Sequence, residues 1–300
     1  MDAAVRTEGL SKTYGDTVLA LDHLDLEVGR GEIFGFLGPN GAGKSTTIRL
    51  LLDLIRPSAG RAEILGKDCQ RDSVEVRALT GYLPGDVRLY DRLSGQQTVE
   101  FFGSLRRRPV KPDRVVALAE RLDLDLTRRA GVLSKGNRQK LGLLVALLDQ
   151  PPVLLLDEPT SGLDPLLQHT VWEVLREEAE RGATVFFSSH VMSEVEEICE
   201  RVGILRDGRL VEVAPVSDLK GRSVRRVIAR FGDTPPGTAA FRLPGVREVE
   251  RHDGVVEFSV DGDIGGLVQA LAEHGVRDLE SRAPTLDEVM RAFYEEEGPA

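Results

Sequence analysis

The stretch Gly38-Pro39-Asn40-Gly41-Ala42-Gly43-Lys44-Ser45-Thr46 decides the fold, because its glycines and its lysine are spaced as in a phosphate-binding loop. Residues 32–37 before it, which are apolar except for Glu32, predict a buried strand. The apolar residues after it follow helical spacing and predict one buried helix face: Ile48, Leu51, Leu52 and Ile55. A helix N-terminus presents unpaired N–H groups and partial positive charge, and glycines let the backbone wrap an anion closely. The order strand, loop, helix therefore predicts a phosphate site.

Individual roles follow from the position of each residue in this loop. Lys44 can reach the β- and γ-phosphates of a nucleotide, and Ser45 can ligate Mg²⁺. We expect the other nucleotide contacts of the loop to come from Gly38, Asn40, Gly41, Gly43 and Thr46. The alternative is a glycine-rich turn that binds nothing, but every fixed position and both flanks fit the phosphate loop.

Length and composition set the class of protein. The 300 residues suggest about two domains, and 41% hydrophobic with 29% charged residues is ordinary for a globular chain. A net charge of −10 argues against a broad nucleic-acid surface, so no nucleic-acid partner is expected. A local basic patch stays open at Arg106-Arg107-Arg108, with Lys111 and Arg114, although a solvated helix end or loop is the favoured interpretation.

The cysteines and the N-terminus bear on location. Cys69 and Cys199 lie far apart and form no disulfide framework, which indicates a reducing compartment. Residues 1–6 have neither a basic nor an apolar signal region, so no signal peptide is expected. The longest apolar run, residues 141–148, is far shorter than the roughly 20 residues that span a bilayer. Any membrane role must therefore come through a partner.

The chain is predicted to contain an α/β domain over residues 1–215 and a small α+β domain over 216–300. The first has strands at 5–8, 20–28, 153–156 and 184–187, helices opened by Asp164-Pro165 and spanning 191–202, and a hairpin turn at Asp207-Gly208. Its segment 86–150 is helix-rich. The second has strands at 224–231, 246–250 and 255–260, a helix at 267–274, and a last helix opened by the capping box of residues 285–288.

Two carboxylates follow the buried strand at 153–156. Asp157 stands at the carboxyl end of that strand, where open α/β sheets bind ligands, and can hold Mg²⁺. Glu158 beside it is a candidate general base, or a residue that orients water for attack on the γ-phosphate. The alternative is a solvated Asp-Glu strand end, which the phosphate loop upstream disfavours.

These motifs, together with Leu133-Ser134-Lys135-Gly136-Asn137 and Ser161-Gly162-Leu163-Asp164, resemble an ATP-binding cassette (ABC) ATPase. The resemblance implies a P-loop NTPase fold, with a RecA-like core and a helical subdomain over about 86–150. It also implies that His190 is a catalytic switch histidine, that Tyr14 stacks on adenine, and that Asp164 contacts the nucleotide. Ser134 and Gly136 would touch the phosphates of ATP bound to a second copy.

The chain departs from the family pattern at two places. Lys135 and Asn137 replace a glycine and a glutamine of the signature, while Ser134 and Gly136 remain. Gly85 stands where the family has a lid glutamine and cannot ligate Mg²⁺; Asp86 or water could substitute.

The resemblance implies an ATP hydrolase that uses Mg²⁺, closes as a homodimer on ATP and pairs with a separate integral-membrane permease. Its variants resemble the drug- and lipid-exporting, daunorubicin-resistance-type branch, which implies a cytoplasmic protein held on the inner face of the cell membrane by the permease. The alternative is a soluble cassette that acts on ribosomes or DNA. A single phosphate loop and the absence of sustained heptads between residues 46 and 133 disfavour it. A non-hydrolysing regulatory cassette would lack Glu158 or His190.

Overall fold

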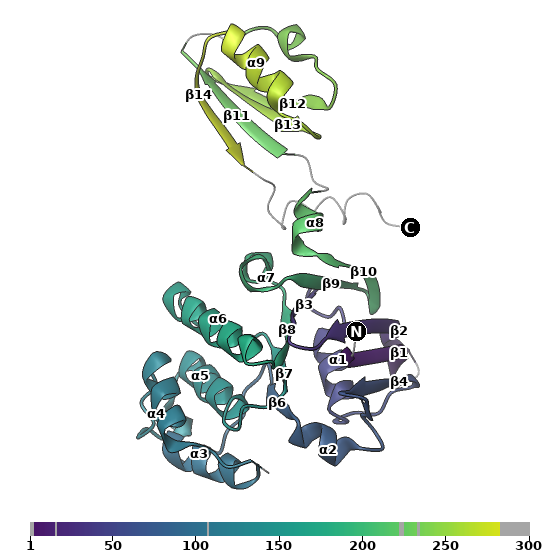
Figure 1. Ribbon diagram of the computed structural model, residues 1–300, viewed down its shortest axis with the longest axis vertical. Coiled ribbons are helices and arrows are strands. Elements are labelled where there is room, and N and C mark those ends of the chain that lie inside the picture. Colours follow the sequence, from purple (N-terminus) through teal and green to yellow (C-terminus); the bar gives the residue numbers. More distant parts are fainter. Residues whose placement is uncertain (1–2, 16, 107, 222–224, 233–234, 283–300) are drawn as a thin grey trace. The chain divides into compact units, whose positions relative to one another are not determined.

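The computed structural model describes residues 3–15, 17–106, 108–221, 225–232 and 235–282. It divides the chain into two compact units, Met1–Ala214 and Pro215–Ala300 (Figure 1). The centre of the first unit is a six-stranded sheet in the order β10-β9-β3-β8-β7-β6, in which β6, β7, β8, β3 and β9 run parallel. The strands are β3 (Ile33–Leu37), β6 (Thr80–Leu83), β7 (Val153–Asp157), β8 (Thr184–Ser189), β9 (Arg201–Arg206) and β10 (Arg209–Pro215). Every residue of β3, β7 and β8 is buried, as a parallel sheet covered on both faces requires.

A second, antiparallel sheet packs over the helix that follows the phosphate loop. Its order is β2-β1-β4-β5, with β1 (Ala3–Tyr14), β2 (Val18–Gly29), β4 (Ala59–Ile64) and β5 (Lys67–Asp68). One apolar cluster joins this sheet, α1 (Lys44–Leu51) and the central strands; its members include Leu24, Ile48 and Phe186. The helix α1 is thus held between two sheets, which fixes the direction of its N-terminus.

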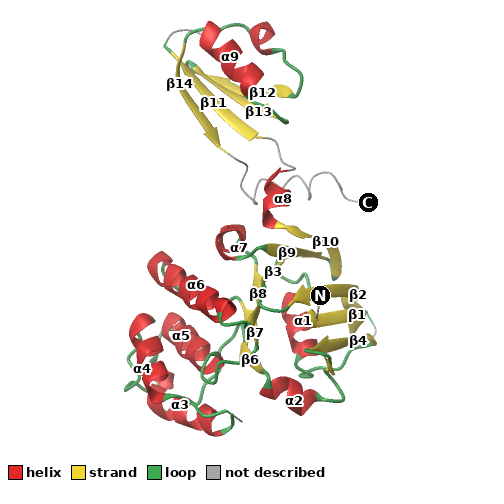
Figure 2. Cartoon of the chain, viewed as in Figure 1, coloured by secondary structure: helices red, strands yellow, loops and turns green. Residues whose placement is uncertain are grey.

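The remaining helices of the first unit are α2 (Ser73–Ala78), α3 (Gly95–Ser104), α4 (Pro112–Arg121), α5 (Lys135–Ala146), α6 (Pro165–Glu180) and α7 (Met192–Ile198), with a 3-10 turn at Ala130–Val132. Figure 2 shows α3 to α6 gathered on one side of strands β6 to β8. Asp164 caps α6 and Pro165 is its first residue, as predicted. Within the described residues, no helix is both long and apolar enough to cross a membrane.

Two predicted helices are too long. The predicted helix of the phosphate loop included Ile55, but α1 ends at Leu51. Asp53 adopts a left-handed conformation with φ 54°, and the N–H groups of Leu54 and Asp53 donate to the carbonyls of Arg49 and Leu50. This Schellman motif turns the chain away, so Ile55 reaches the core from outside the helix.

The predicted helix at 191–202 is likewise shorter. It ends at Ile198, and Cys199 is already extended with ψ 141°. Val202 belongs to β9, where it pairs with Gly35 of β3. Buried strand and buried helix residues share the same apolar signal over a short run, which is why the sequence pattern did not separate them. Cys69 and Cys199 form no disulfide with each other, as expected; both are buried, and burial raises the pKa of the Cys69 thiol to about 12.

Three of the arginines considered as a basic patch bind the end of α5, and Arg107 lies outside the described residues. Guanidinium groups of Arg106, Arg114 and Arg108 donate to the carbonyl oxygens of Val145, Leu147 and Gln150, respectively. These carbonyls lie at and just beyond the C-terminus of α5, where cations are favourable. The side chains of Arg106 and Arg114 are only 16% exposed. Both therefore serve the fold as partly buried structural groups, which differs from the solvated helix end that the sequence favoured.

The second unit is a four-stranded antiparallel sheet in the order β12-β13-β11-β14. Its elements are α8 (Val216–Gly221), β11 (Arg225–Phe231), the 3-10 turn η2 (Thr238–Phe241), β12 (Val246–His252), β13 (Val255–Val260), α9 (Gly265–Glu273) and β14 (Val276–Arg282). This order is that of a split β-α-β, or ferredoxin-like, fold with the first helix reduced to η2. Leu267 and Leu271 of α9 pack on Val256 and Phe258 of β13 in its core. The capping box of residues 285–288 lies outside the described residues.

Candidate functional site

The phosphate loop connects β3 to α1, as the sequence predicts, and its shape depends on glycine. A Cβ atom at Gly38 would lie 2.3 Å from the carbonyl oxygen of Leu205, and one at Gly43 would lie 2.6 Å from that of Ala20. Gly43 is also left-handed, with φ 112°. The loop is thus pressed against the backbone on one side. Gly41 has φ 86° and no atom near its would-be Cβ, so the backbone there is open to a ligand.

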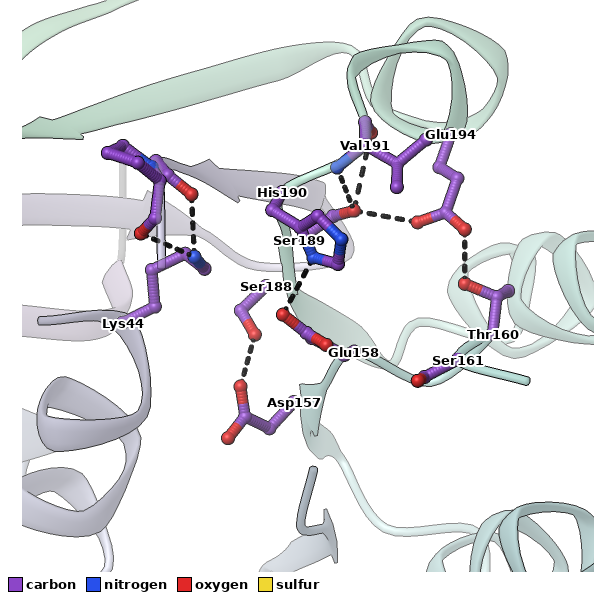
Figure 3. Close-up of polar contacts among 12 residues, drawn as sticks. Lys44, Asp157, Glu158, Thr160, Ser161, Ser188, Ser189, His190, Val191 and Glu194 are labelled. Carbon is purple, nitrogen blue, oxygen red and sulfur yellow. Dashed lines mark hydrogen bonds and ion pairs between the residues drawn. The ribbon is translucent and has the colours of Figure 1, made fainter. Parts of the chain in front are cut away.

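Lys44 lies at the start of α1 and is only 6% exposed. Its Nζ donates to the carbonyl oxygens of Gly38 and Pro39, at 2.6 and 3.1 Å (Figure 3). Burial lowers the pKa of Lys44, while the negative charges of Glu158 and Asp157 oppose this shift. The partners of the ammonium group here are the partial charges of two carbonyl oxygens. A bound anion would offer it a full negative charge instead, so the lysine is suited to bind an anion.

Asp157 ends β7 and is 5% exposed. Its Oδ1 accepts a hydrogen bond of 2.6 Å from Ser188 at the neighbouring strand end. A cavity of about 370 Å³ lies between this carboxylate and α1; it is lined by Ser45, Arg49, Pro84, Gly85, Asp86, Arg88, Asp157 and Glu158. A serine hydroxyl, a carboxylate and room for water are the ligand set that Mg²⁺ prefers. The positions of Ser45 and Asp157 are therefore compatible with their predicted role as Mg²⁺ ligands.

Glu158 and His190 come together from the ends of β7 and β8. Glu158 Oε1 lies 2.8 Å from Nδ1 of His190 (Figure 3). Both side chains are partly exposed, at 27% and 45%. Glu158 is left-handed, with φ 50°, and its N–H donates to the carbonyl oxygen of Ser188. The strained backbone turns the carboxylate away from the sheet edge toward the histidine.

Ser134 is the N-cap of α5, and Gly136 in the first turn of this helix lies against the loop after β7. Ser134 caps the helix by accepting from the N–H of Asn137 at 3.3 Å. A Cβ at Gly136 would lie 2.8 Å from the carbonyl oxygen of Gly162. Lys135, the unusual signature residue, donates to Ser161 Oγ at 3.3 Å. The substitution thus ties the signature segment to the loop of residues 161–164.

Tyr14 and Asp164 lie on exposed parts of the first unit. Tyr14 ends β1, is 39% exposed, and has the Lys12 ammonium 5.2 Å above its ring. Asp164 accepts from the N–H of Leu167 at 3.1 Å as the cap of α6. This hydrogen bond therefore caps α6, while the exposed carboxylate of Asp164 can still accept further hydrogen bonds.

Gly85 lies directly beside Asp157. A Cβ at this position would be 3.3 Å from Asp157 Oδ2. The next residue, Asp86, lines the same cavity, and its carboxylate accepts from Arg88 at 2.9 Å. Gly85, where the family has a lid glutamine, therefore lies against Asp157, the expected metal ligand, and the acidic side chain of Asp86 follows it.

Several polar residues that hold the site are not predicted by the sequence motifs. Ser188 follows a buried apolar run, and the same argument that identified Asp157 could have found it. Thr160 and Glu194 are buried and bonded to each other, and no spacing in the sequence indicates this contact. Gln139 of α5 donates to the carbonyl oxygen of Glu158 at 3.0 Å.

Comparison with known proteins gives the same result over most of the chain. Residues 21–161 match the family model of ABC transporters. The chain is 38% identical to a daunorubicin resistance ATP-binding protein of Streptomyces coeruleorubidus, over 96% of this chain and 95% of the relative. It is 36% identical to a Nod factor export ATP-binding protein of Rhizobium sp., over 95% of each.

A solved ATP-binding subunit of an ABC transporter shares the fold, with a TM-score of 0.67 and 28% identity over 72% of this chain and 92% of that one. These matches confirm the predicted fold class and the predicted resemblance. The chain belongs to the ABC transporter family, as one of its ATP-binding and ATP-hydrolysing subunits.

Proposed function

We propose that the chain binds ATP at the loop of residues 38–46 and hydrolyses it with Glu158 and His190 to power export through a separate membrane permease. Loop N–H groups and Lys44 would hold the β- and γ-phosphates, with Gly38, Asn40, Gly41, Gly43 and Thr46 shaping the cradle. The buried Lys44 and the glycine-dependent loop support this role.

Ser45 and Asp157 would hold Mg²⁺ at the edge of the cavity described above. When bound, the ion would neutralise charge on the β- and γ-phosphates. Ser188 keeps one oxygen of Asp157 occupied, so the carboxylate has a fixed orientation.

Glu158 would orient and deprotonate the attacking water, and His190 would hold this carboxylate in place. The 2.8 Å contact between them is the single observation that carries the proposal of hydrolysis, because a histidine at this distance would orient the carboxylate that is to act as the base. Glu158 is partly exposed and can reach a water in the cavity that it lines.

Two copies would close head to tail around ATP. Ser134 is exposed at the start of α5, and within the part of the chain that the structure describes its side chain accepts a hydrogen bond from its own helix alone, which leaves it able to meet a nucleotide on a second copy. Gly136 and Asp164 would approach the same nucleotide, while Tyr14 of the binding copy would stack on adenine. Hydrolysis would remove the γ-phosphate that joins the two surfaces, which makes the interface a switch.

Residues 1–215 would form the ATP-binding domain, with its helical subdomain over about 86–150, and 216–300 an accessory α+β domain. The two compact units, and relatives named for daunorubicin resistance and Nod factor export, support this organisation and the export role. The permease would keep the subunit on the inner face of the cell membrane. Neither relative is named for ribosomes or DNA.

The substitution Glu158→Gln tests the proposal. It keeps the shape of the side chain but removes the base, so we expect a dimer that forms with ATP and Mg²⁺ and turns over slowly. Size-exclusion chromatography and phosphate release measure the two effects. A monomer that hydrolyses ATP at the wild-type rate would refute the proposal. Co-purification from detergent-solubilised membranes tests the permease, and recovery only with ribosomes or DNA would contradict it.

A further inference from the structure

A buried carboxylate, Glu194 of α7, lies behind the Glu158–His190 pair. It is 6% exposed, and its two oxygens accept hydrogen bonds from the loop after β7 and from the end of β8, where the next loop begins. Thr160 Oγ1 donates to Oε1 at 2.5 Å, and Ser189 Oγ donates to Oε2 at 2.7 Å (Figure 3). Thr160 and Ser189 are each 1% exposed, so water does not compete for these bonds.

The two loops are the ones that carry the candidate catalytic groups. Thr160 is two residues beyond Glu158, and Ser189 immediately precedes His190. The contacts form a closed ring: Glu158 meets His190 on one side, and Thr160, Glu194 and Ser189 join the same two loops on the other. Movement of either loop must break a buried bond to Glu194.

The backbone on both sides of the ring needs such support. Glu158 has φ 50°, a conformation that costs a residue other than glycine about 1 kcal/mol or more. On the other loop, Ser189 Oγ also accepts from the N–H of Val191 at 2.9 Å, which fixes the chain on either side of His190. Gln139 holds the carbonyl oxygen of Glu158 but makes no contact with the His190 loop in the hydrogen bonds of the described residues.

We propose that Glu194 is a positioning residue that holds His190 against Glu158 by bridging Thr160 and Ser189. It touches neither substrate nor metal and acts through the two loops. This inference rests on the proposed roles of Glu158 and His190.

The test compares variants of the full-length chain by the kcat and KM of ATP hydrolysis with Mg²⁺. Glu194→Leu removes both acceptors, and Thr160→Val removes one donor with little change of shape. We expect each to lower kcat about tenfold while KM changes less than about twofold, because misplacement of a catalytic group slows chemistry without weakening phosphate binding. Glu194→Gln can still accept from Ser189 and can donate to Thr160, so it should retain kcat within about threefold.

Glu197→Gln is the matched control. It lies on the same helix, 47% exposed, and pairs with Arg176 on the surface, so its kcat should be that of the wild type. Thermal unfolding of every variant separates loss of fold from loss of positioning. If Glu194→Leu does not fold, Thr160→Val and Glu194→Gln still decide the question.

The most decisive measurement is the effect of Glu194→Leu on kcat in a protein that already carries His190→Ala. If Glu194 acts through His190, Glu194→Leu should cause no further loss of kcat there. An equal loss in both backgrounds would overturn the proposal, as would a Glu194→Gln variant as slow as Glu194→Leu. Retained wild-type activity in Glu158→Gln and His190→Ala would instead refute the proposed function, whereas loss in these two with full activity in Glu194→Leu refutes only the role of Glu194.

Discussion

The ammonium group of Lys44 lies 2.6 Å from the carbonyl oxygen of Gly38. Both residues belong to the loop that would bind phosphate. The charge of Lys44 is therefore buried, and burial lowers its pKa below the ordinary value of 10.5 despite the nearby carboxylates. Bound phosphate favours the charged form, so ATP binding and protonation of Lys44 are linked.

We predict that ATP affinity falls as the pH rises through the lowered pKa of Lys44, and that this fall begins at a lower pH than for an exposed lysine. The sign follows because the deprotonated amine loses its attraction for phosphate. Titration of binding with ATP at a series of alkaline pH values measures this. Lys44→Arg is the control, since its charge persists over the range; an equal decline in both proteins would contradict the prediction.

Gly38 has no room for a side chain. Gly38→Ala would place Cβ 2.3 Å from the carbonyl oxygen of Leu205, a backbone atom that cannot move without displacing β9. We expect a loss of about 3 kcal/mol in the free energy of unfolding, measured with urea. Gly31→Ala, at φ 72° with open space around it, should lose only about 1 kcal/mol from backbone strain. Equal losses would show that the close contact does not matter.

Asp86 is a candidate to replace the absent lid glutamine. It follows Gly85 and lines the cavity that Ser45 and Asp157 share. We predict that Asp86→Ala raises the Mg²⁺ concentration for half-maximal ATP hydrolysis by about threefold, the loss of one hydrogen bond to a hydrated ion. Arg88→Ala, which frees Asp86 from its 2.9 Å partner, should not raise it. An unchanged requirement in Asp86→Ala would mean that water serves in this place.

Glu178 of α6 pairs with two arginines, one on α4 and one at the end of its own helix. Its side chain is 2% exposed and pairs with Arg114 of α4 and with Arg181. Glu178→Ala would leave the largely buried guanidinium group of Arg114 without its carboxylate, so we expect a loss of about 3–5 kcal/mol of unfolding free energy. Glu173→Ala on the same helix removes an exposed pair with Arg121 and should cost under about 1 kcal/mol. Chemical unfolding of both variants checks this, and a small effect at Glu178 would show that the arginines find other partners.

The sequence predicted the elements whose signal is local. Buried strands before the phosphate loop and before Asp157, the cap at Asp164 and the turn at Asp207-Gly208 are present as predicted. It did not predict β4, β5 or β14, whose half-exposed residues lack an apolar run. The helices predicted at the positions of α1 and α7 were too long. The apolar spacing does not reveal the left-handed turn at Asp53 that ends α1, and Val202 would be buried in a helix as well as in the strand that it forms.

The sequence by itself determined the chemistry of this protein: the loop of residues 38–46, the carboxylates Asp157 and Glu158, and the family to which they belong. These are contiguous motifs, whose spacing fixes the backbone groups and side chains offered to a phosphate. Only the tertiary structure decided that the arginines near 106 brace α5 and that Glu194 joins Thr160 to Ser189. Most of these contacts join residues that are distant in sequence, and their strength depends on burial in the folded protein, which a pattern along one chain does not record.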